Sequence, residues 1–421
     1  MAMTAIQVVA TELEKVDERG AIPVLFERED TFYSFIEKRP VDVVSERDMR
    51  IPLELRPGGK FGHFDADGGD LGRGEGPVFD KAIINTVNLK HGVEWTKRAE
   101  WGTDDRRKAV VNTLRHLLAT SMAEFRRNID SLSMTGGDGV LGTISAFTAN
   151  AGGTGNTTAT LGSDGFGARL LRYGQPINIY NSTLTTNRTV GAERSISFYD
   201  GPNKQIKFVD VSGLANGDKI VVSGLAATPP VSLLGVPYHH SAASTGLWLG
   251  FDRALTPEIR GNAVNAAGGL AIPHARLAMN KVGDRVGRSK RKVTAWMHPA
   301  QVQAYEELGM TVSVINRRPS GGESLDVYFG EDMTIAGVPI KTHFSWDKTR
   351  IDFIVSDTWG RAEMHAPGFY TVDGRRIFEI RGASGGVATS QIFYLCASFN
   401  FFLRNPAEIS YIYGLTVPAG Y

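Results

Sequence analysis

Cysteine is almost absent from this chain, because Cys396 is the single one among 421 residues. One cysteine cannot form a disulfide within the chain, and this scarcity is typical of proteins that fold in a reducing compartment. Cys396 lies in an apolar, strand-like run, which predicts a buried structural thiol and not a nucleophile.

Long apolar runs and a charge imbalance are missing as well. No run approaches the roughly 18 apolar residues that a membrane-spanning helix requires, and residues 1–19 lack the basic and apolar regions of a secretory signal. Lys and Arg total 46 against 45 Asp and Glu, so no strong overall field attracts nucleic acid or a membrane. These absences predict a chain that folds in a cytosol without a membrane partner.

A hydrolase-like motif fails on its context. Gly382–Gly386 matches G-x-S-x-G, the nucleophile elbow of hydrolases, which needs a helix directly after the serine and a later histidine. The residues after Ser384 read as a strand, and the last histidine of the chain is His365. A glycine-rich connection between strands is the better interpretation, and no enzyme activity is expected.

Metal and phosphate motifs fail on their spacing. Gly59-Lys60 lacks the earlier glycine of a phosphate-binding loop. Asp65, Asp67 and Asp70 resemble part of a calcium loop, but its sixth position is not glycine and its twelfth is not glutamate. His239-His240 are adjacent in an expected loop, and adjacent side chains rarely point at one metal ion. The sequence therefore predicts no cofactor and no metal site.

A glycine-rich, charged segment between two β-type segments is the most informative feature that is present. The first β-type segment is Met49–Leu55, the tip Gly58–Gly76 holds eight glycines, and the return segment alternates apolar and polar residues over Thr86–Thr96. A period of two predicts a strand with one buried face. Because a two-stranded ribbon is only marginally stable alone in water, we expect this arm to lie on another copy of the chain.

A long amphipathic helix is predicted next, over Thr103–Ser133. Its apolar residues recur at steps of three and four, Thr103 is a suitable N-cap, and Gly136-Gly137 ends it. About thirty residues give a length of roughly 45 Å. Its basic residues, which include Arg126 and Arg127, either form a solvated face or contact a packaged polyanion or a partner.

The middle of the chain changes from loop-like to β-rich sequence. Thr135–Gly174 is rich in Gly, Thr, Ser and Asn, which predicts loops. Gln175–Val264 alternates short β-type runs with turns, and Asn216-Gly217-Asp218 is a hairpin signal. We interpret this segment as a small β-barrel or sandwich inserted into a larger domain.

The two ends of the chain complete an α+β protein. Residues 1–48 read as an arm with two short helices, over Ile6–Val16 and Phe32–Glu37, that pack elsewhere. The elements expected after Ala271 are helices over His274–Val286 and from His298-Pro299 to Leu308-Gly309, and strands over Val293–Met297, Thr334–His343, Arg350–Val355, Gln391–Leu403 and Ile409–Leu415. The aromatic density of the last two strands predicts a buried sheet.

One short basic cluster interrupts this region. It consists of Arg288, Lys290, Arg291 and Lys292. The cluster has no interleaved aromatic residues, so a groove for single-stranded nucleic acid is not indicated. It is either a solvated turn or a contact for nucleic acid or another acidic partner.

The order of these features resembles the major capsid proteins of tailed bacteriophages with the HK97-type fold. The segments that carry the resemblance are Arg50–Leu53 leading into Pro57–Gly59, Asp67–Gly74, Thr103–Ser133, Thr294–Leu308 and Ser410–Leu415. The first two look like the E-loop, the third like the spine helix of the P-domain, the fourth like the A-domain and the last like the final P-domain strand. The resemblance covers nearly the whole chain except Gln175–Val264.

The resemblance implies a domain organisation and a set of contacts. The domains are an N-terminal arm (1–48), an E-loop ribbon (49–97), a P-domain with its spine helix (98–135), an A-domain (136–387) with an inserted β-domain (175–264), and returning P-domain strands (388–421). The E-loop residues expected to contact a neighbouring subunit are Lys60, Phe61, Asp67, Asp70, Arg73 and Trp95.

The function implied by the resemblance is structural. Such a chain assembles as hexamers and pentamers into an icosahedral shell that encloses double-stranded DNA, in the host cytoplasm and then in the virion. The implied partners are a scaffolding protein, since the arm is too short to hold a scaffolding segment, a portal protein and, where one exists, a decoration protein. Two alternatives stay open: the shell of an encapsulin-type nanocompartment, and a β-rich tail or adhesion protein.

Some members of this family form isopeptide cross-links between an E-loop lysine and an asparagine of the next subunit. Lys60 lies in the matching region, but no asparagine partner can be identified, so we expect an ordinary surface lysine. Dissolved particles should therefore give one band near the chain mass of 45.7 kDa in denaturing electrophoresis. A ladder of multiples of that mass would contradict this expectation.

Overall fold

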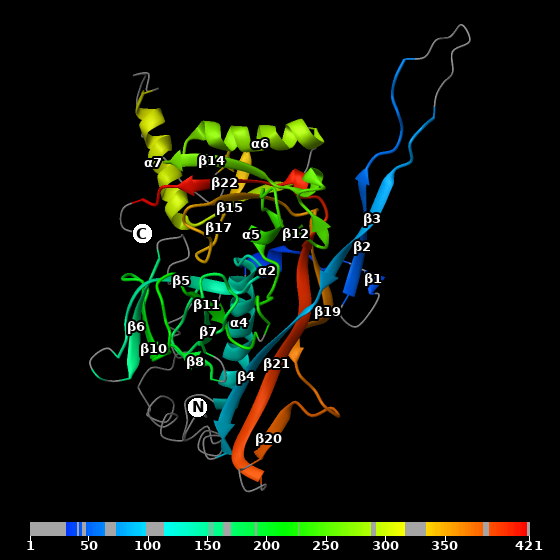
Figure 1. Cartoon of the computed structure of the whole chain (residues 1–421). Helices are drawn as coiled ribbons and strands as arrows, with labels where there is room; N and C mark the ends of the chain where they lie inside the picture. The colour runs from blue at the N-terminus through cyan, green and yellow to red at the C-terminus, as the bar shows by residue number, and fades with distance from the viewer. Residues whose placement is uncertain are drawn as a thin grey trace, which may run out of the picture. The chain divides into compact units, whose positions relative to one another are not determined.

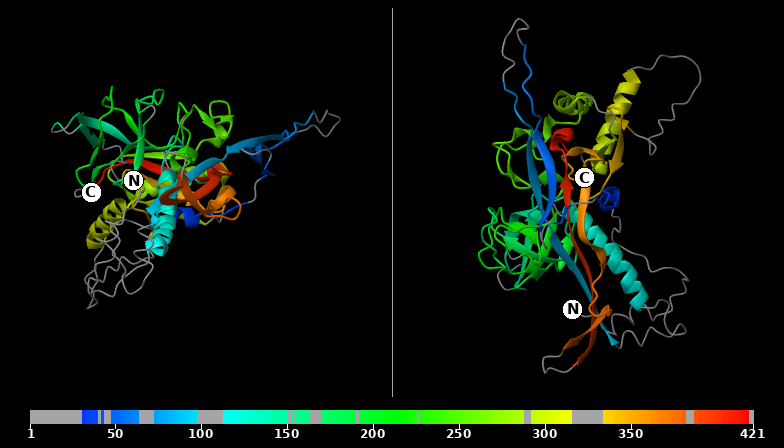
Figure 2. Two further views of the ribbon diagram at one scale, coloured as in Figure 1. Left: turned by 90° about the horizontal axis from the view of Figure 1, so that it is seen from below. Right: turned by 90° about the vertical axis from the view of Figure 1, so that its right-hand side faces the viewer.

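A computed structural model of the chain (Figures 1 and 2) describes residues 31–39, 42–43, 48–63, 73–97, 113–150, 153, 155–162, 170–189, 192–225, 227–287, 292–315, 334–381 and 387–418. The chain divides into two compact units. Unit 1 takes its described residues from 1–35, 86–131 and 363–400, and unit 2 takes them from 36–85, 132–362 and 401–421.

A sheet built around one long strand forms most of unit 1. Its strands are β4 (Val87–Thr96), β19 (Trp359–Phe369), β20 (Ile377–Arg381) and β21 (Val387–Leu403). β21 pairs antiparallel with β4 over ten residues, from Ser390 opposite Thr96 to Phe399 opposite Val87, and it also pairs with β19 and β20. The predicted alternation of β4 is confirmed, because its apolar residues are more buried than the polar residues between them.

The long helix α4 (Thr113–Ser133) confirms the predicted amphipathic helix over its described part. Phe125, Ile129 and Leu132 are buried at steps of four and three, as the sequence periodicity predicted. The helix ends where expected, whereas the predicted N-cap Thr103 lies outside the described residues. Arg127 is a correction: it is buried and paired with Glu124, so it does not belong to a solvated basic face.

The second arm helix is also present, as α2 (Thr31–Phe35). Phe32 and Tyr33 are buried in unit 1, and the Tyr33 amide donates a hydrogen bond of 2.8 Å to the Asp130 carboxylate of α4. The Tyr33 ring also meets Phe399 edge-on, with ring centres 5.8 Å apart. The first predicted arm helix lies outside the described residues.

The ribbon has a different second strand from the one predicted. β2 (Asp48–Arg56) pairs antiparallel with β3 (Val78–Asn85) and with the short β1 (Asp42–Val43). The strand over Val87–Thr96, expected to return the ribbon, is β4 and pairs with β21 instead. The alternating pattern of that segment indicated a buried face correctly but could not indicate which strand lies beside it.

The inserted β-domain is a closed barrel that begins earlier than predicted. Its strands are β5 (Val140–Thr148), β6 (Asn156–Leu161), β7 (Pro176–Tyr180), β8 (Arg194–Ser195), β9 (Phe198–Asp200), β10 (Gln205–Val209) and β11 (Lys219–Val222), in the order β8-β7-β11-β5-β6-β10-β9. β8 and β9 stand at the two ends of this order, yet only two residues separate them in the sequence. One segment therefore pairs with β7 through β8 and with β10 through β9, which closes the barrel.

Two predictions in this region are wrong. Thr135–Gly174 was expected to be loops, yet it supplies β5 and β6, whose threonines suit strands as well as turns. The turn at Asn216-Gly217-Asp218 exists, with a positive φ at Gly217, but the strands on either side of it do not pair with each other. The prediction of a barrel or sandwich is otherwise consistent with the apolar interior, where Ile144, Ile206 and Phe208 are fully buried.

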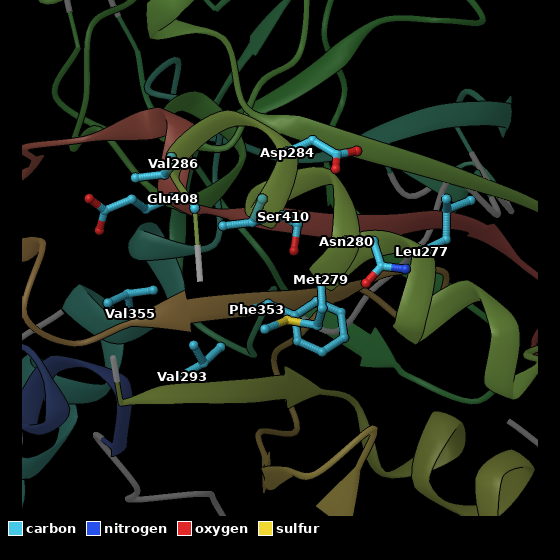
Figure 3. A pocket seen from close by; sticks show the side chains of 13 residues that line it. Leu277, Met279, Asn280, Asp284, Val286, Val293, Phe353, Val355, Glu408 and Ser410 are labelled. Atoms are coloured by element: carbon cyan, nitrogen blue, oxygen red, sulfur yellow. The ribbon is translucent and has the colours of Figure 1, made fainter. Parts of the chain in front are cut away.

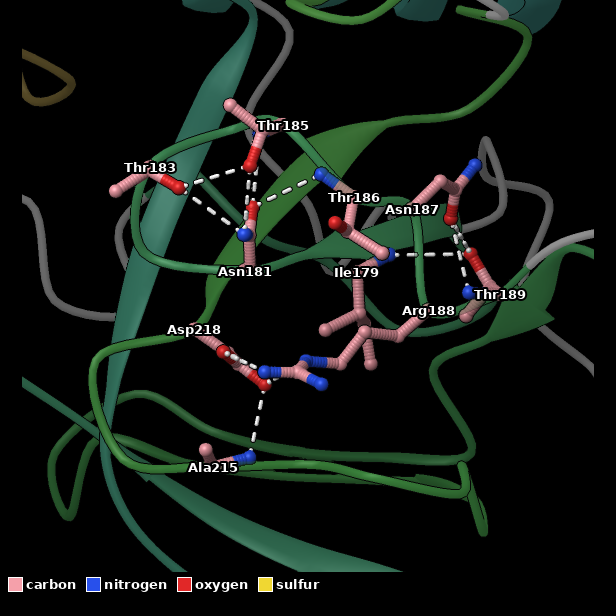
Figure 4. Close-up of polar contacts among 10 residues, drawn as sticks. All are labelled: Ile179, Asn181, Thr183, Thr185, Thr186, Asn187, Arg188, Thr189, Ala215 and Asp218. Carbon is pink, nitrogen blue, oxygen red and sulfur yellow. Dashed lines mark hydrogen bonds and ion pairs between the residues drawn. The ribbon is translucent and has the colours of Figure 1, made fainter.

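Polar side chains order one end of the barrel (Figure 4). The Asn181 carboxamide oxygen accepts hydrogen bonds from the amides of Thr185 and Thr186, at 2.8 and 3.0 Å, and so closes the turn after β7. Arg188 forms an ion pair with the buried carboxylate of Asp218, with an N–O distance of 2.6 Å. These contacts satisfy the polar groups of a turn-rich sequence and are structural in character.

A six-stranded sheet with two helices forms the rest of unit 2. The strands are β14 (Asn262–Gly268), β15 (Val293–Met297), β16 (Thr334–Ile335), β17 (Val338–Thr342), β18 (Ile351–Val355) and β22 (Ser410–Leu415), in the order β14-β22-β18-β15-β17-β16, and the helices are α6 (Ile272–Val286) and α7 (Pro299–Ile315). The elements predicted after Ala271 are present, except that Thr334–His343, predicted as one strand, forms the two strands β16 and β17, which pair antiparallel. The end of α7 is a correction, because the helix continues through Gly309, and one glycine costs a helix only about 1 kcal/mol.

A small group of short elements lies between the barrel and this sheet in the sequence. They are α5 (Val236–His239), β12 (Leu247–Trp248), β13 (Phe251–Asp252) and the 3-10 helix η3 (Pro257–Ile259), while a further 3-10 helix, η4 (Pro406–Glu408), precedes β22. His239 and His240 were expected in a loop, but both are fully buried, one at the end of α5 and one directly after it. Cys396 is a further correction, because it is only half-buried.

The start of α5 depends on a close backbone approach at Gly235. A Cβ atom at this position would lie 2.2 Å from the Ser133 carbonyl oxygen and 2.3 Å from that of Thr135. Gly235→Ala should therefore lower the free energy of unfolding by about 3 kcal/mol, because backbone atoms cannot move aside cheaply. The measurement is the midpoint of urea unfolding.

Gly283 in α6 provides a matched control for that substitution. No atom lies within 4 Å of a Cβ added there, and the residue is helical. Gly283→Ala should raise the unfolding free energy by about 0.5–1 kcal/mol, because alanine favours the helix. Equal effects of the two substitutions would contradict the role given to Gly235.

Candidate functional site

The β2–β3 ribbon has a buried base and an exposed far end, and Figure 1 shows it (blue) extending away from the rest of unit 2. At the base, Met49 lies opposite Ile84 and Ile51 lies opposite Ala82, and all of them are buried. Farther along the ribbon the apolar side chains are less covered: Leu53 and Leu55 are half-buried, and Phe61, Val78 and Phe79 are exposed. The ribbon therefore carries apolar side chains beyond the point where its own chain covers them.

The two segments of the ribbon stay close together at the start of the glycine-rich tip. The Gly59 amide donates a hydrogen bond of 2.6 Å to the Glu75 carbonyl, and Gly59 has a φ of +101°. A Cβ atom at Gly58 would lie 2.5 Å from the Pro77 nitrogen, so only glycine allows the two strands to approach here. These glycines keep the far end narrow.

Charges of both signs accompany the exposed apolar residues. Lys60, Arg73 and Glu75 lie at the far end, and Asp80 and Lys81 lie on β3; all are exposed. The ion pair between Arg56 and Glu258, at 3.5 Å, joins two exposed side chains and contributes little to stability. An exposed apolar surface with mixed charges is typical of a protein contact and not of a polyanion-binding strip.

The described residues offer no arrangement for chemistry. Within the described ranges, no three His, Cys, Asp or Glu side chains gather closely enough to hold a metal ion. Among the same residues, no helix combines the length and apolar character needed to cross a bilayer. The residues Gly382–Gly386 lie outside the description, but the segment after them is the strand β21, not the helix that a nucleophile elbow needs.

A groove of about 800 Å³ lies beside α6 (Figure 3). Its lining includes apolar Val293, Phe353 and Val355 and polar Ser410 and Glu408. The Glu408 carboxylate accepts a hydrogen bond of 2.6 Å from the Asn405 side chain, so it is held by its own loop. The groove has no convergent set of charged groups that identifies a ligand.

The predicted contact residues separate into three groups. Lys60, Phe61 and Arg73 are exposed at the far end of the ribbon, as a contact with another subunit requires. Asp67 and Asp70 lie outside the described residues. Trp95 is 1% exposed and packs on Phe393, with ring centres 5.7 Å apart, so its side chain belongs to the core of its own unit.

The basic cluster is described only at its last residue. Lys292 is exposed directly before β15, and Arg288, Lys290 and Arg291 lie outside the described residues. Sequence reasoning missed Val78 and Phe79, the exposed apolar pair that begins β3. The sequence does show an apolar pair directly after Pro77. The returning strand was assigned to the alternating segment farther along the chain, so this pair was not assigned to a strand.

Comparison with known structures identifies the fold. No protein-family model matches the sequence, and no curated protein matches it. A chain of the cyanophage A-1(L) capsid asymmetric unit is similar in structure, with a TM-score of 0.56 at 10% identity over 97% of this chain and 99% of that chain. This chain has the fold of that capsid protein.

Two further structures are similar over almost the same extent. The capsid of the native GTA particle has a TM-score of 0.46 at 12% identity, covering 95% of this chain and 94% of that chain. The holo-SrpI encapsulin complex from Synechococcus elongatus has a TM-score of 0.47 at 8% identity, covering 96% and 93%. The capsid fold is assigned from the cyanophage chain, because these two scores fall below 0.5.

The two halves of the ribbon should respond differently to substitution. Ile84→Ala removes a fully buried side chain at the base and should lower the unfolding free energy by about 2–4 kcal/mol. Phe79→Ser changes a side chain that is 66% exposed and should shift it by less than about 0.5 kcal/mol. Urea unfolding of both variants tests this difference, and a large loss in Phe79→Ser would show that the far end is covered by its own chain.

Proposed function

We propose that this chain is the major capsid protein of a tailed bacteriophage, with the HK97-type arrangement of arm, E-loop, P-domain and A-domain. The observation that carries the proposal is the shared fold with a capsid chain over nearly the full length of both proteins. On this proposal β2 and β3 form the E-loop, α4 is the spine helix, and the sheet of β15 and β18 belongs to the A-domain. The sequence assigned Ser410–Leu415 to the final P-domain strand, but this strand, β22, pairs with β14 and β18 in that same sheet, so we group it with the A-domain. The barrel is an insertion.

The ribbon supplies the physical basis for assembly. Its far end exposes Phe61, Val78 and Phe79, which a neighbouring copy would cover. Because the ribbon and the surface that would cover it are different parts of the chain, each contact is heterologous, and heterologous contacts form rings when the rotation between copies closes. Hexamers and pentamers joined in this way form an icosahedral shell that encloses double-stranded DNA.

The partners follow from the same proposal. A scaffolding protein guides assembly in the host cytoplasm, a portal protein occupies one vertex of the virion, and a decoration protein would use the inserted barrel. The basic cluster that ends at Lys292 supplies contacts for DNA or another acidic partner, whereas Lys60 and Arg73 supply contacts for a neighbouring subunit. The shell of a nanocompartment shares this architecture, and the contents of purified particles distinguish the two: packaged DNA identifies a virus and cargo enzymes identify a compartment.

Electron microscopy of the purified chain, expressed alone and with a candidate scaffolding protein, tests the proposal directly. We expect closed, finite shells in at least one of the two samples. Discrete monomers in both samples would contradict the capsid function, and open fibres or tubes would instead support the tail or adhesion alternative.

The ribbon contact can be tested by a double substitution. Phe61→Ser with Phe79→Ser should reduce the yield of shells roughly tenfold or more, since truncating one buried aromatic anchor costs about 2 kcal/mol of contact energy. The variant should keep the urea midpoint of the parent chain, because both side chains are exposed in the isolated chain.

Val209→Ser is the matched control for this variant. Val209 is 52% exposed but lies on β10 of the barrel, so its substitution should leave shell assembly unchanged. Normal shells from the double variant, or equal loss in the control, would show that the far end of the ribbon is not the assembling surface.

A further inference from the structure

The base of the ribbon is held by the β12–β13 hairpin of the same unit. Trp248 lies opposite Phe251, and the two residues between them, Leu249 and Gly250, form the turn. Their φ angles are +48° and +96°, as a tight turn of the type favoured in hairpins requires. The Leu249 carbonyl accepts a hydrogen bond of 2.9 Å from the amide of Ile83 on β3. We call this hairpin, together with His239, the clasp.

A fully buried histidine, His239, connects the β12–β13 hairpin to the backbone at Phe401. The Trp248 indole donates its N–H to His239 Nδ1 at 3.2 Å, and His239 Nε2 lies 3.2 Å from the Phe401 carbonyl oxygen. A carbonyl oxygen only accepts and an indole N–H only donates, so Nε2 carries the proton and Nδ1 is the acceptor. The clasp is thus closed by a neutral imidazole in one tautomer.

The surroundings of His239 oppose a second proton more strongly than they favour it, because burial and two cationic neighbours outweigh the backbone carbonyls of Phe401 and Leu234, which favour the charged ring. The rings of Tyr238 and Trp359 meet it edge-on, with centres 5.2 and 5.1 Å away. The titratable groups that act on it are His240 and Arg253, and both are cationic when protonated. The nearby carboxylate of Asp352 is bonded to His240 Nδ1 at 2.7 Å. Burial first, and then His240, lower the pKa of His239 from 6.5 to about 3.

We propose that His239 is an acid-sensitive pin: its neutral form closes the clasp on the ribbon, and its protonation releases the hairpin and frees the base of the ribbon. A proton on Nδ1 removes the acceptor for the Trp248 N–H and sets two N–H groups against each other. The positive charge would also be buried, next to Arg253 and without a carboxylate of its own. The pin is a property of this chain, whereas its use in freeing an intersubunit arm rests on the proposed function.

The sign of the pH effect follows from the two states of the clasp. In the open clasp, water reaches His239, which then titrates near its ordinary pKa of 6.5, whereas the closed clasp resists protonation until about pH 3. The closed form is therefore fully favoured above pH 6.5 and loses stability as the pH falls toward 3. Between pH 7.5 and pH 5 the open population should rise about 30-fold.

Hydrogen exchange on the full chain, before any assembly, tests the pin. Peptides that cover Val78–Asn85 report the Ile83 amide, and exchange rates are corrected for the intrinsic effect of pH. Protection of Ile83 should fall about 30-fold between pH 7.5 and pH 5, while protection of barrel strand β10 stays constant. Unchanged protection at Ile83, or a parallel loss in β10, would overturn the proposal, the latter because it indicates global unfolding.

Three variants identify the group responsible. In His239→Asn the side-chain oxygen can still accept from Trp248 but does not titrate, so the pH dependence at Ile83 should disappear. His240→Asn is the matched control, since it removes the neighbouring titration and should keep the 30-fold change. If His239→Asn does not fold, Trp248→Phe removes only the donated N–H and should lower Ile83 protection already at pH 7.5. Full pH dependence in His239→Asn, or normal protection in Trp248→Phe, would overturn the pin.

The outcome for assembly is independent of these measurements. A chain that shows the pin but forms no shells would leave the clasp established and contradict the capsid function. A chain that forms shells but shows constant Ile83 protection would support the capsid function and overturn the pin.

Discussion

The rest of this architecture depends on one constraint: the described residues of the chain cover the base of the two-stranded ribbon but not its far end. At the base, Met49 and Ile84 are buried, and the Leu249 carbonyl accepts a hydrogen bond from the Ile83 amide. The far end has no such cover, so Phe79 and Phe61 stay exposed. An exposed apolar ribbon of this kind either promotes aggregation or serves in specific association, and on the proposed function the neighbouring copies of a shell would cover it.

The other β-rich parts of the molecule are closed and so do not compete with the ribbon for partners. The barrel uses the continuous segment of β8 and β9 to pair with both edge strands, which leaves it without a long open edge. Its apolar residues point inward, as the alternation along β6 and β10 shows. On the proposed function, a closed barrel of this kind adds to the capsid fold without offering an open strand edge that would compete with the ribbon for partners.

Local pattern predicted the elements well and their partners poorly. The end of α4, the strand β15 and the terminal strands follow from periodicity, capping residues and aromatic density, all of which are local. The partner of Val87–Thr96 depends on β21, about 300 residues away, and no local pattern contains that information. The exposed end of the ribbon was found because glycine-rich tips are visible in sequence, whereas the burial of Trp95 and of the adjacent histidines depends on tertiary packing.

The two adjacent histidines show why acid should act on the clasp before it acts on the sheet. His240 donates to Asp352, which Arg350 and the Trp346 indole also contact, and despite burial the charge of Arg350 holds the pKa of Asp352 at about 2. That carboxylate therefore contributes stability above its ordinary pKa and loses it only as the pH falls from about 4 toward 2. Burial also lowers the pKa of His240, but the Asp352 carboxylate opposes that shift, whereas His239 has no such partner. Between about pH 4 and 6.5 the attachment of the ribbon should weaken while the Asp352 network in the sheet remains ionised and paired, so the arm can be freed without unfolding the domain that carries it.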